Sequence, residues 1–191
     1  MNNTEKSSKT KQNIRALAES AILIALAFIL SYIQIYKLPQ GGSVTLASML
    51  PILIIGIRWG GEWGLGSGLV YAALQMIQGF YPPPVPTAVN YILVIMLDYL
   101  IAFSILGLSA IFRKMKFGII ISVPVCLFLR FLCHFISGVI VWGVYAPDGT
   151  LPAIYSLIYN GSQMGVEAIL TMIITVILYR ILPKKFLTPF V

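Results

Sequence analysis

The sequence predicts an all-α membrane protein with six transmembrane helices and both termini in the cytoplasm. Of its 191 residues, 59% are hydrophobic and only 10% are charged, whereas soluble domains carry about 25% charged residues. A run of about 20 apolar residues spans a bilayer as a helix, and residues 14–179 divide into runs of this kind. The basic residues gather between alternate runs, which indicates how the protein is oriented in the membrane.

The first three runs are separated by short breakers. Residues 1–12 are polar and basic, and the first run, 14–36, has no cleavage site, so we expect it to stay in the protein as a helix. Pro39, Gly41 and Gly42 end this run. The second run, 44–57, is short for an upright span and is expected to tilt or to be partly re-entrant. The third run covers 63–80.

Prolines delimit the second half of the chain. Residues 81–86 carry four prolines, so this connection cannot be the interior of a helix. The fourth run covers 89–112, the fifth covers 117–144 with Pro124 as a candidate kink, and the sixth covers 153–182 before Pro183. The expected domains are a cytoplasmic N-terminal segment, 1–13, a six-helix transmembrane domain, 14–182, and a cytoplasmic C-terminal tail, 183–191.

The positions of the cations predict the orientation, because lysine and arginine favour the cytoplasmic side. The connections on one side hold Lys6, Lys9, Lys11, Arg15, Arg58, Arg113, Lys114, Lys116, Arg180, Lys184 and Lys185, whereas the opposite connections hold only Lys37. These residues form no basic stripe with interleaved aromatic rings, so the formal charge of +7 does not indicate a nucleic-acid partner.

Two helix faces carry small residues at a spacing of four. Gly60, Gly64 and Gly68 form one face, which we expect to pack inside the bundle. Ala21 and Ala25 form the other, and for them an external partner is as good an interpretation as internal packing. The cysteines Cys126 and Cys133 are seven residues apart on one helix, too far for a disulfide, and we expect both to be small buried residues.

Polar residues inside the membrane are costly and mark the places where function is expected. Asp98, His134, Tyr155 and Asn160 come from three predicted helices and all fall toward the outer end. They predict a pocket that opens outward and suits a small, cationic, aromatic ligand, because carboxylates and aromatic rings attract cations.

Two other pairs of residues have more than one interpretation. Arg130 and Glu167 fit a buried ion pair between helices as well as a ligand role. Trp142 and Tyr145 close the outer end of the fifth helix, where they fit either an interfacial aromatic belt or the pocket. No phosphate-binding loop, HExxH or GxSxG motif and no metal-ligand spacing is present, so an enzyme, a metal site or a cofactor is not expected.

Several strings in the chain resemble the ThiT/YuaJ family, the thiamine-specific substrate-binding subunits (S components) of energy-coupling factor transporters. They follow in order between residues 15 and 160: GSVTLASMLP at 42–51, LDY at 97–99, RFLCHFISG at 130–138, Trp142 with YAP at 145–147, and YSLIYN at 155–160.

The resemblance implies a multi-pass protein of the bacterial cell membrane that captures thiamine from outside and has no energy source of its own. Its implied partners are a transmembrane scaffold protein and two cytoplasmic ATPases. The implied substrate-binding residues are Asp98, Tyr99, His134, Gly138, Trp142, Tyr155 and Asn160. Ala21 and Ala25 are implied to meet the scaffold. Some members of the family have glutamate at the position of Asp98 and a tryptophan in the first loop, where this chain has Gly41 and Gly42, and the proline-rich segment 81–90 is not aligned with the family. A thiamine precursor or another small cationic heterocycle therefore stays open as the ligand.

Two other functions compete with this interpretation. A self-sufficient secondary carrier could couple to protons through Asp98, His134 and Glu167, although the sequence has no inverted repeat of the kind that such carriers often contain. A structural or assembly protein without a ligand would leave the outer polar cluster without a purpose.

Overall fold

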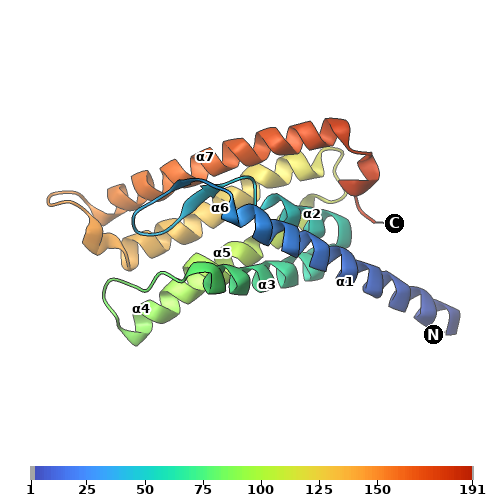
Figure 1. The fold of residues 1–191 in the computed structure, drawn as a ribbon, viewed down its shortest axis with the longest axis horizontal. Coiled ribbons are helices and arrows are strands. Elements are labelled where there is room, and N and C mark those ends of the chain that lie inside the picture. Colours follow the sequence, from blue (N-terminus) through green and yellow to red (C-terminus); the bar gives the residue numbers. More distant parts are fainter. Residues whose placement is uncertain (1–2, 191) are drawn as a thin grey trace.

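The computed structural model describes residues 3–190, so Met1 and Asn2 of the predicted N-terminal segment and Val191 of the predicted tail lie outside the described residues. The described chain forms an elongated helical bundle in which α6 and α7 lie side by side and both ends of the chain lie at one end (Figure 1). Its six helices are α1 (Asn3–Tyr32), α2 (Leu50–Trp59), α3 (Gly61–Gly79), a continuous fourth helix over 88–112, α6 (Gly118–Ile140) and α7 (Pro152–Ile181).

The fourth helix changes its geometry along its length. It begins as α4 (Ala88–Leu93), where the Thr87 side chain accepts a hydrogen bond from the Asn90 backbone N–H. It continues as a π-helical stretch, η1 (Val94–Leu100), a short α5 (Ile101–Ser104) and a 3₁₀ stretch, η2 (Ile105–Phe112). A π-helical turn widens a helix and is frequent at functional sites. Asp98 and Tyr99 both lie in this stretch.

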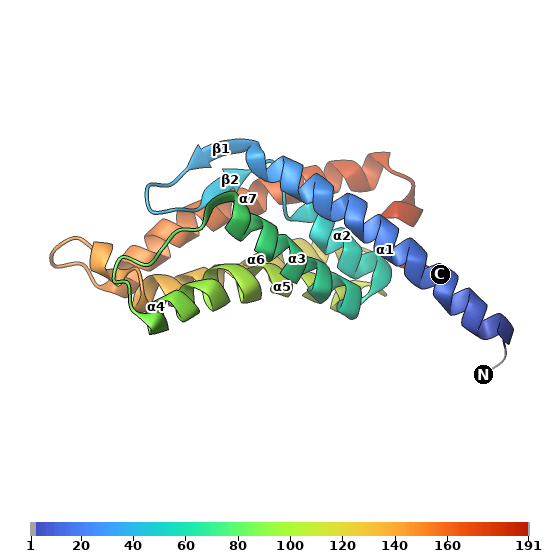
Figure 2. The ribbon, with the colours of Figure 1, turned by 60° about the horizontal axis from the view of Figure 1, so that its bottom comes forward.

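The prediction of an all-α fold is wrong between the first two helices. Helix α1 ends at Tyr32 rather than at residue 36, and β1 (Gln34–Lys37) then pairs antiparallel with β2 (Ser43–Thr45) in a hairpin that lies along α7 (Figure 2). Gly41 and Gly42 in the turn both have a positive φ, which glycine adopts at little cost. Val44 is therefore a strand residue and not the start of the second helix.

The six predicted spans differ in length and hydropathy: four of the helices could cross a membrane by themselves, and α2 and α3 do not meet the same standard. Within the described residues, four stretches are long and apolar enough to cross a membrane, namely Ser7–Tyr32, Ala88–Phe112, Gly118–Ile140 and Pro152–Ile181. Helix α2 has only 10 residues and α3 has 19. Ten helical residues extend about 15 Å, half the thickness of the hydrocarbon core, and α2 is buried along almost its whole length, so it packs inside the bundle.

The glycine face of α3 packs inside the bundle, as predicted. A Cβ on Gly64 would lie 2.8 Å from the Gly107 Cα, and one on Gly68 would lie 2.7 Å from the Ser104 Cα. Real Cβ atoms do not approach backbone this closely, so α3 and the fourth helix depend on these glycines for their contact. Cys126 and Cys133 are free and buried, which confirms their interpretation as small core residues.

Candidate functional site

A cavity of about 200 Å³ lies between the hairpin, α3, the fourth helix, α6 and α7. Its lining includes the hairpin turn, Gly79 at the end of α3 and Tyr155 near the start of α7, and these segments lie away from the end of the bundle that holds the two termini (Figure 1). The structure brings all seven predicted substrate-binding residues to its wall: Asp98, Tyr99, His134, Gly138, Trp142, Tyr155 and Asn160. Their role in binding stays a prediction.

Asp98 is held in one orientation by three neighbours from α6 and the turn after it. Its Oδ1 lies 3.0 Å from the His134 Nδ1, and its Oδ2 accepts hydrogen bonds from the Ser137 Oγ at 2.6 Å and the Trp142 Nε1 at 3.1 Å. The Asp98 side chain is only 15% exposed. A fixed carboxylate on a largely dehydrated wall attracts a cation more strongly than the same group does in water.

Three polar atoms around the cavity have no partner. Among the described residues, the Gln75 Nε2, the Arg130 Nε and the His134 Nε2 are buried and make no hydrogen bond, and all three residues line the cavity. Leaving a buried polar group unpaired costs about 1–3 kcal/mol. These atoms are therefore candidates for hydrogen bonds to a bound molecule.

Helix α7 reaches the cavity because Gly138 on α6 has no side chain. A Cβ at Gly138 would clash with the Ser156 Oγ and would lie 2.8 Å from the Asn160 Nδ2. The Asn160 Nδ2 donates to the His134 carbonyl oxygen at 3.2 Å and to the Ser156 Oγ at 3.1 Å. This leaves the Asn160 Oδ1 as the acceptor that the side chain offers to a ligand.

Aromatic rings form much of the remaining wall. Trp142 stacks on Tyr145 with ring centroids 6.3 Å apart, and Tyr155 lies 5.7 Å from Tyr159. Because the Trp142 N–H is bound to Asp98, the cavity is the better interpretation for this tryptophan than an interfacial belt. Tyr145 does not line the cavity and is 44% exposed, which fits the belt.

Tyr99 positions the start of the proline-rich connection. Its hydroxyl donates to the Gly79 carbonyl oxygen at 3.2 Å and accepts from the Tyr81 backbone N–H at 3.1 Å. The Tyr81 ring then lines the cavity opposite Gly41, where a Cβ would lie 2.9 Å from it. Tyr81 could not be selected from the sequence, because the prolines around it obscure any periodicity.

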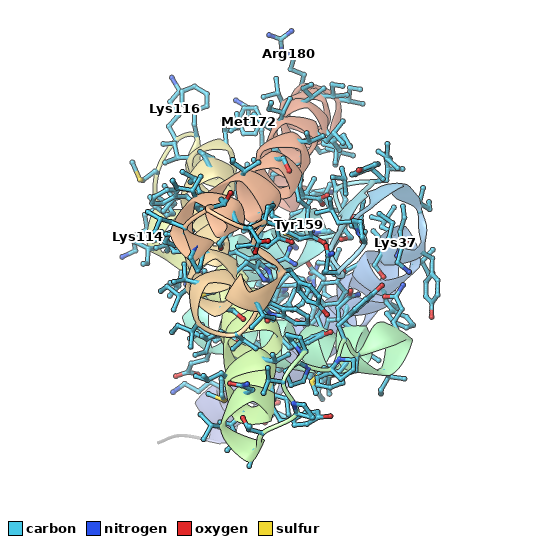
Figure 3. The ribbon with its side chains drawn as sticks, turned by 90° about the vertical axis from the view of Figure 1, so that its left-hand side faces the viewer. Lys37, Lys114, Lys116, Tyr159, Met172 and Arg180 are labelled. Carbon is cyan, nitrogen blue, oxygen red and sulfur yellow. The ribbon has the colours of Figure 1, made fainter. Side chains whose placement is uncertain are left out.

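The hairpin is attached to α7 by residues at a spacing of four. The Tyr159 hydroxyl accepts from the Gln40 backbone N–H at 2.9 Å and donates to the Gly41 carbonyl oxygen at 3.1 Å. The Gln163 Nε2 donates to the Ser43 carbonyl oxygen at 3.0 Å. Figure 3 looks along the bundle and shows Tyr159 between α7 and the hairpin strand that carries Lys37.

Glu167 completes this series one turn further along α7. Its carboxylate accepts hydrogen bonds from the Thr45 backbone N–H at 2.6 Å and from the Thr45 Oγ1 at 2.8 Å. Tyr155, Tyr159, Gln163 and Glu167 therefore lie on one face of α7. This spacing was available in the sequence and indicates a polar helix face, although it does not show that the face binds a β-hairpin.

The ion pair considered between Arg130 and Glu167 does not form. Arg130 contacts the Met49 Sδ and lies with its guanidinium carbon 4.2 Å from the centre of the Phe103 ring. Glu167 is occupied by Thr45. Arg130 lines the cavity whereas Glu167 does not. The two residues, which we considered as a pair from the sequence, therefore have different surroundings.

The site has the groups needed for binding a small molecule. It combines one carboxylate, the two cations Lys37 and Arg130, several aromatic rings and a set of neutral hydrogen-bonding groups. No group of three or more histidine, cysteine, aspartate or glutamate side chains that could hold a metal ion occurs in the part of the chain that the structure describes. The chemistry of the wall suits a small aromatic cation.

Comparisons with known proteins agree on one family. The family model described as "Thiamine transporter protein" (Thia_YuaJ) matches residues 17–187. Thiamine transporter ThiT of Bacillus subtilis is 36% identical over an alignment that covers 92% of this chain and 95% of that protein. Thiamine transporter ThiT of Lacticaseibacillus paracasei is 29% identical, covering 89% of each chain. A solved structure of ThiT from Listeria monocytogenes is similar in fold, with a TM-score of 0.74 at 24% identity over 92% of this chain and 98% of that one.

Proposed function

The chain belongs to the Thia_YuaJ family of thiamine transporter proteins, and from this we propose that the cavity between the hairpin, α3, the fourth helix, α6 and α7 is where it binds thiamine. The protein is a multi-pass membrane transporter for thiamine, an S component of the energy-coupling factor type, and not an enzyme. The main support for this site is the position of Asp98, whose carboxylate is held by three hydrogen-bonding neighbours on a wall that is rich in aromatic rings.

The chemistry of thiamine matches these groups. Its thiazolium ring carries a permanent positive charge, and its pyrimidine ring carries an amino group and ring nitrogens. Asp98 supplies the negative charge that neutralises the cation, and Trp142 and Tyr155 supply ring faces for stacking and cation–π contact. The His134 Nε2 and the Asn160 Oδ1 supply the directed hydrogen bonds that the pyrimidine requires.

Titration of the purified protein with thiamine tests this proposal. Because Trp142 lines the cavity, we expect a saturable change in tryptophan fluorescence without ATP or an ion gradient. In Trp142→Phe most of this change should be lost, whereas Trp63→Phe, at the other end of the bundle, should keep it. If Trp142→Phe binds thiamine with the same fluorescence change as the wild-type protein, thiamine does not bind in this cavity.

We propose further that both termini face the cytoplasm and that the cavity faces outward. Arg58 is hydrogen-bonded to the C-terminal tail at Lys185 and Phe190, Arg113 is hydrogen-bonded to Arg58, and Arg180 lies in the last turn of α7 before that tail. This gathering of positive charge near the C-terminus favours the cytoplasmic side. A cysteine placed at Thr150 should then react with an impermeant reagent in intact cells, and one placed at Lys116 should react only after permeabilisation.

The exposed face of α1 is the proposed contact with the transmembrane scaffold of an energy-coupling module with two ATPases. Ala16, Ser20 and Ala27 face the bundle and are buried. Ala21 and Ala25 lie on the opposite face and are exposed. Small residues let a neighbouring helix approach closely in lipid. An independent proton-coupled carrier is a weaker alternative, because Glu167, one of the three groups considered for coupling, is hydrogen-bonded to Thr45.

A further inference from the structure

A second cavity, of about 190 Å³, lies at the end of the bundle that holds both termini. Its polar and aromatic wall is formed by Gln12, Asn13, Arg58, Trp59, Trp63 and Arg113. These residues come from α1, from the junction of α2 with α3 and from the end of the fourth helix. Among the residues that the structure describes, no acidic side chain lines this cavity.

The C-terminal tail closes one side of this second cavity. The Phe190 ring stacks on Trp59 with centroids 4.6 Å apart, and the Arg15 guanidinium carbon lies 4.3 Å from the centre of the same ring. The Phe190 backbone N–H donates to the Arg58 carbonyl oxygen at 3.0 Å. The tail thus holds Arg58 and Trp59 in place, and its Phe190 ring also contacts a third arginine, Arg15.

The charges of the wall are only partly compensated. Arg58 is neutralised by Glu19 and also donates to the Lys185 carbonyl oxygen. Arg113 has no carboxylate partner within the described residues: its Nη2 donates to the Arg58 carbonyl oxygen at 3.2 Å, and its Nε is buried without a partner. The Trp59 Nε1 is also buried without a partner. An anionic hydrogen-bond acceptor in this cavity would pair both donors, the Arg113 Nε and the Trp59 Nε1, and would neutralise the charge of Arg113.

We propose that this cavity binds the phosphate-bearing headgroup of an anionic phospholipid. Basic pockets between membrane helices on the cytoplasmic side are typical sites for such headgroups, and tryptophan favours the same depth of the membrane. Leu17 on α1 is 61% exposed and lies one helical turn from Asn13, on the neighbouring part of the helix surface. It provides an apolar surface for an acyl chain beside the headgroup. This inference is independent of the thiamine cavity.

The thermal unfolding of the full-length protein in detergent tests this site. Phosphatidylglycerol should raise the Tm of the wild-type protein more than phosphatidylcholine does, because a ligand that binds only the folded state stabilises it. Arg113→Gln should lose at least half of this rise. Lys114→Gln is the matched control, since it removes an exposed charge from the next residue and should keep the full rise.

Trp59→Phe provides a second variant that keeps the stacked ring but removes the unpaired N–H, and it should also reduce the rise. If Arg113→Gln does not fold, the result for Trp59→Phe alone tests the proposed lipid site. Thiamine-dependent stabilisation of both variants serves as the test of folding. An equal effect of phosphatidylglycerol on all four proteins would overturn the site. A rise with inorganic phosphate as large as that with the lipid would overturn the lipid as its ligand.

Discussion

At the scale of single residues, the cavity proposed to bind thiamine depends on contacts between α6 and α7 that only small side chains permit. Gly138 lies against Ser156 and Asn160, and Asn160 in turn is bonded to the His134 carbonyl oxygen. One methyl group at this point would displace the asparagine and the histidine together, because close-packed interiors cannot absorb added volume without movement.

We therefore expect Gly138→Ala to weaken thiamine binding. Overpacking costs about 1–3 kcal/mol, and about 1.4 kcal/mol corresponds to a tenfold change in affinity, so a loss of roughly tenfold is expected if the strain falls on the bound state. Gly165→Ala is the control, since a Cβ there has nothing within 4 Å. Equal dissociation constants for Gly138→Ala and the wild-type protein would show that the contact does not shape the cavity.

Several site residues could be predicted from the sequence because polar residues inside the membrane are rare. Asp98, His134 and Asn160 could be selected as polar groups at similar depth, and their presence on one cavity follows from the helix order. The resemblance to the ThiT/YuaJ family, rather than any pattern, indicated Tyr99 and Gly138. Tyr81 and Gln75 were missed, since a tyrosine among prolines and a glutamine in a helix carry no distinguishing pattern.

At the scale of elements, the β-hairpin is the part of the fold that the sequence did not predict. Its residues continue two apolar runs, and a short apolar run does not distinguish a strand from a helix. What determines the hairpin is tertiary contact with α7. Thr45 on β2 is bonded through both its N–H and its hydroxyl to Glu167, at a distance of 122 positions along the chain, and no local pattern encodes such a pair.

Glu167 is expected to hold the hairpin in place. Glu167→Ala would leave the buried Thr45 N–H without its acceptor, at a cost of about 1–3 kcal/mol, and would leave the Thr45 hydroxyl only the Ser48 Oγ as a partner. The variant should therefore have a lower Tm without ligand and bind thiamine more weakly. Glu167→Gln keeps one carbonyl acceptor and should have a smaller effect on both. Thermal unfolding and thiamine titration of the two variants measure this. An unchanged Tm for Glu167→Ala would exclude this role.

At the scale of the whole molecule, the structure divides into two ends with different charge and chemistry. One end holds the cavity proposed to bind thiamine and the hairpin, and the other holds the termini, most of the basic residues and the second cavity. The number of helices and their order could be predicted from the spacing of apolar runs. Their unequal lengths could not, because α2 is stabilised by burial inside the bundle rather than by lipid.

The outer face of α1 should be needed for uptake but not for binding. Ala25→Trp would place a large ring where a scaffold helix is proposed to approach, so cells that contain the energy-coupling module should lose thiamine uptake while the purified variant still binds thiamine. Leu26→Trp is the control, because it is also exposed and lies about 100° around the helix. If Ala25→Trp abolished binding as well, this face would instead be needed for the fold of the protein.

The central claim is that thiamine binds through Asp98, and a comparison of the affinities of Asp98→Asn and the wild-type protein for thiamine tests it most directly. Loss of one member of a buried charge pair costs about 2–5 kcal/mol, and about 1.4 kcal/mol is tenfold in affinity. Asp98→Asn should therefore bind thiamine roughly 30-fold more weakly or worse. Asp148→Asn, which removes a charge from an exposed turn, should bind like the wild-type protein. A folded Asp98→Asn protein with the affinity of the wild-type protein would contradict the assignment of the site.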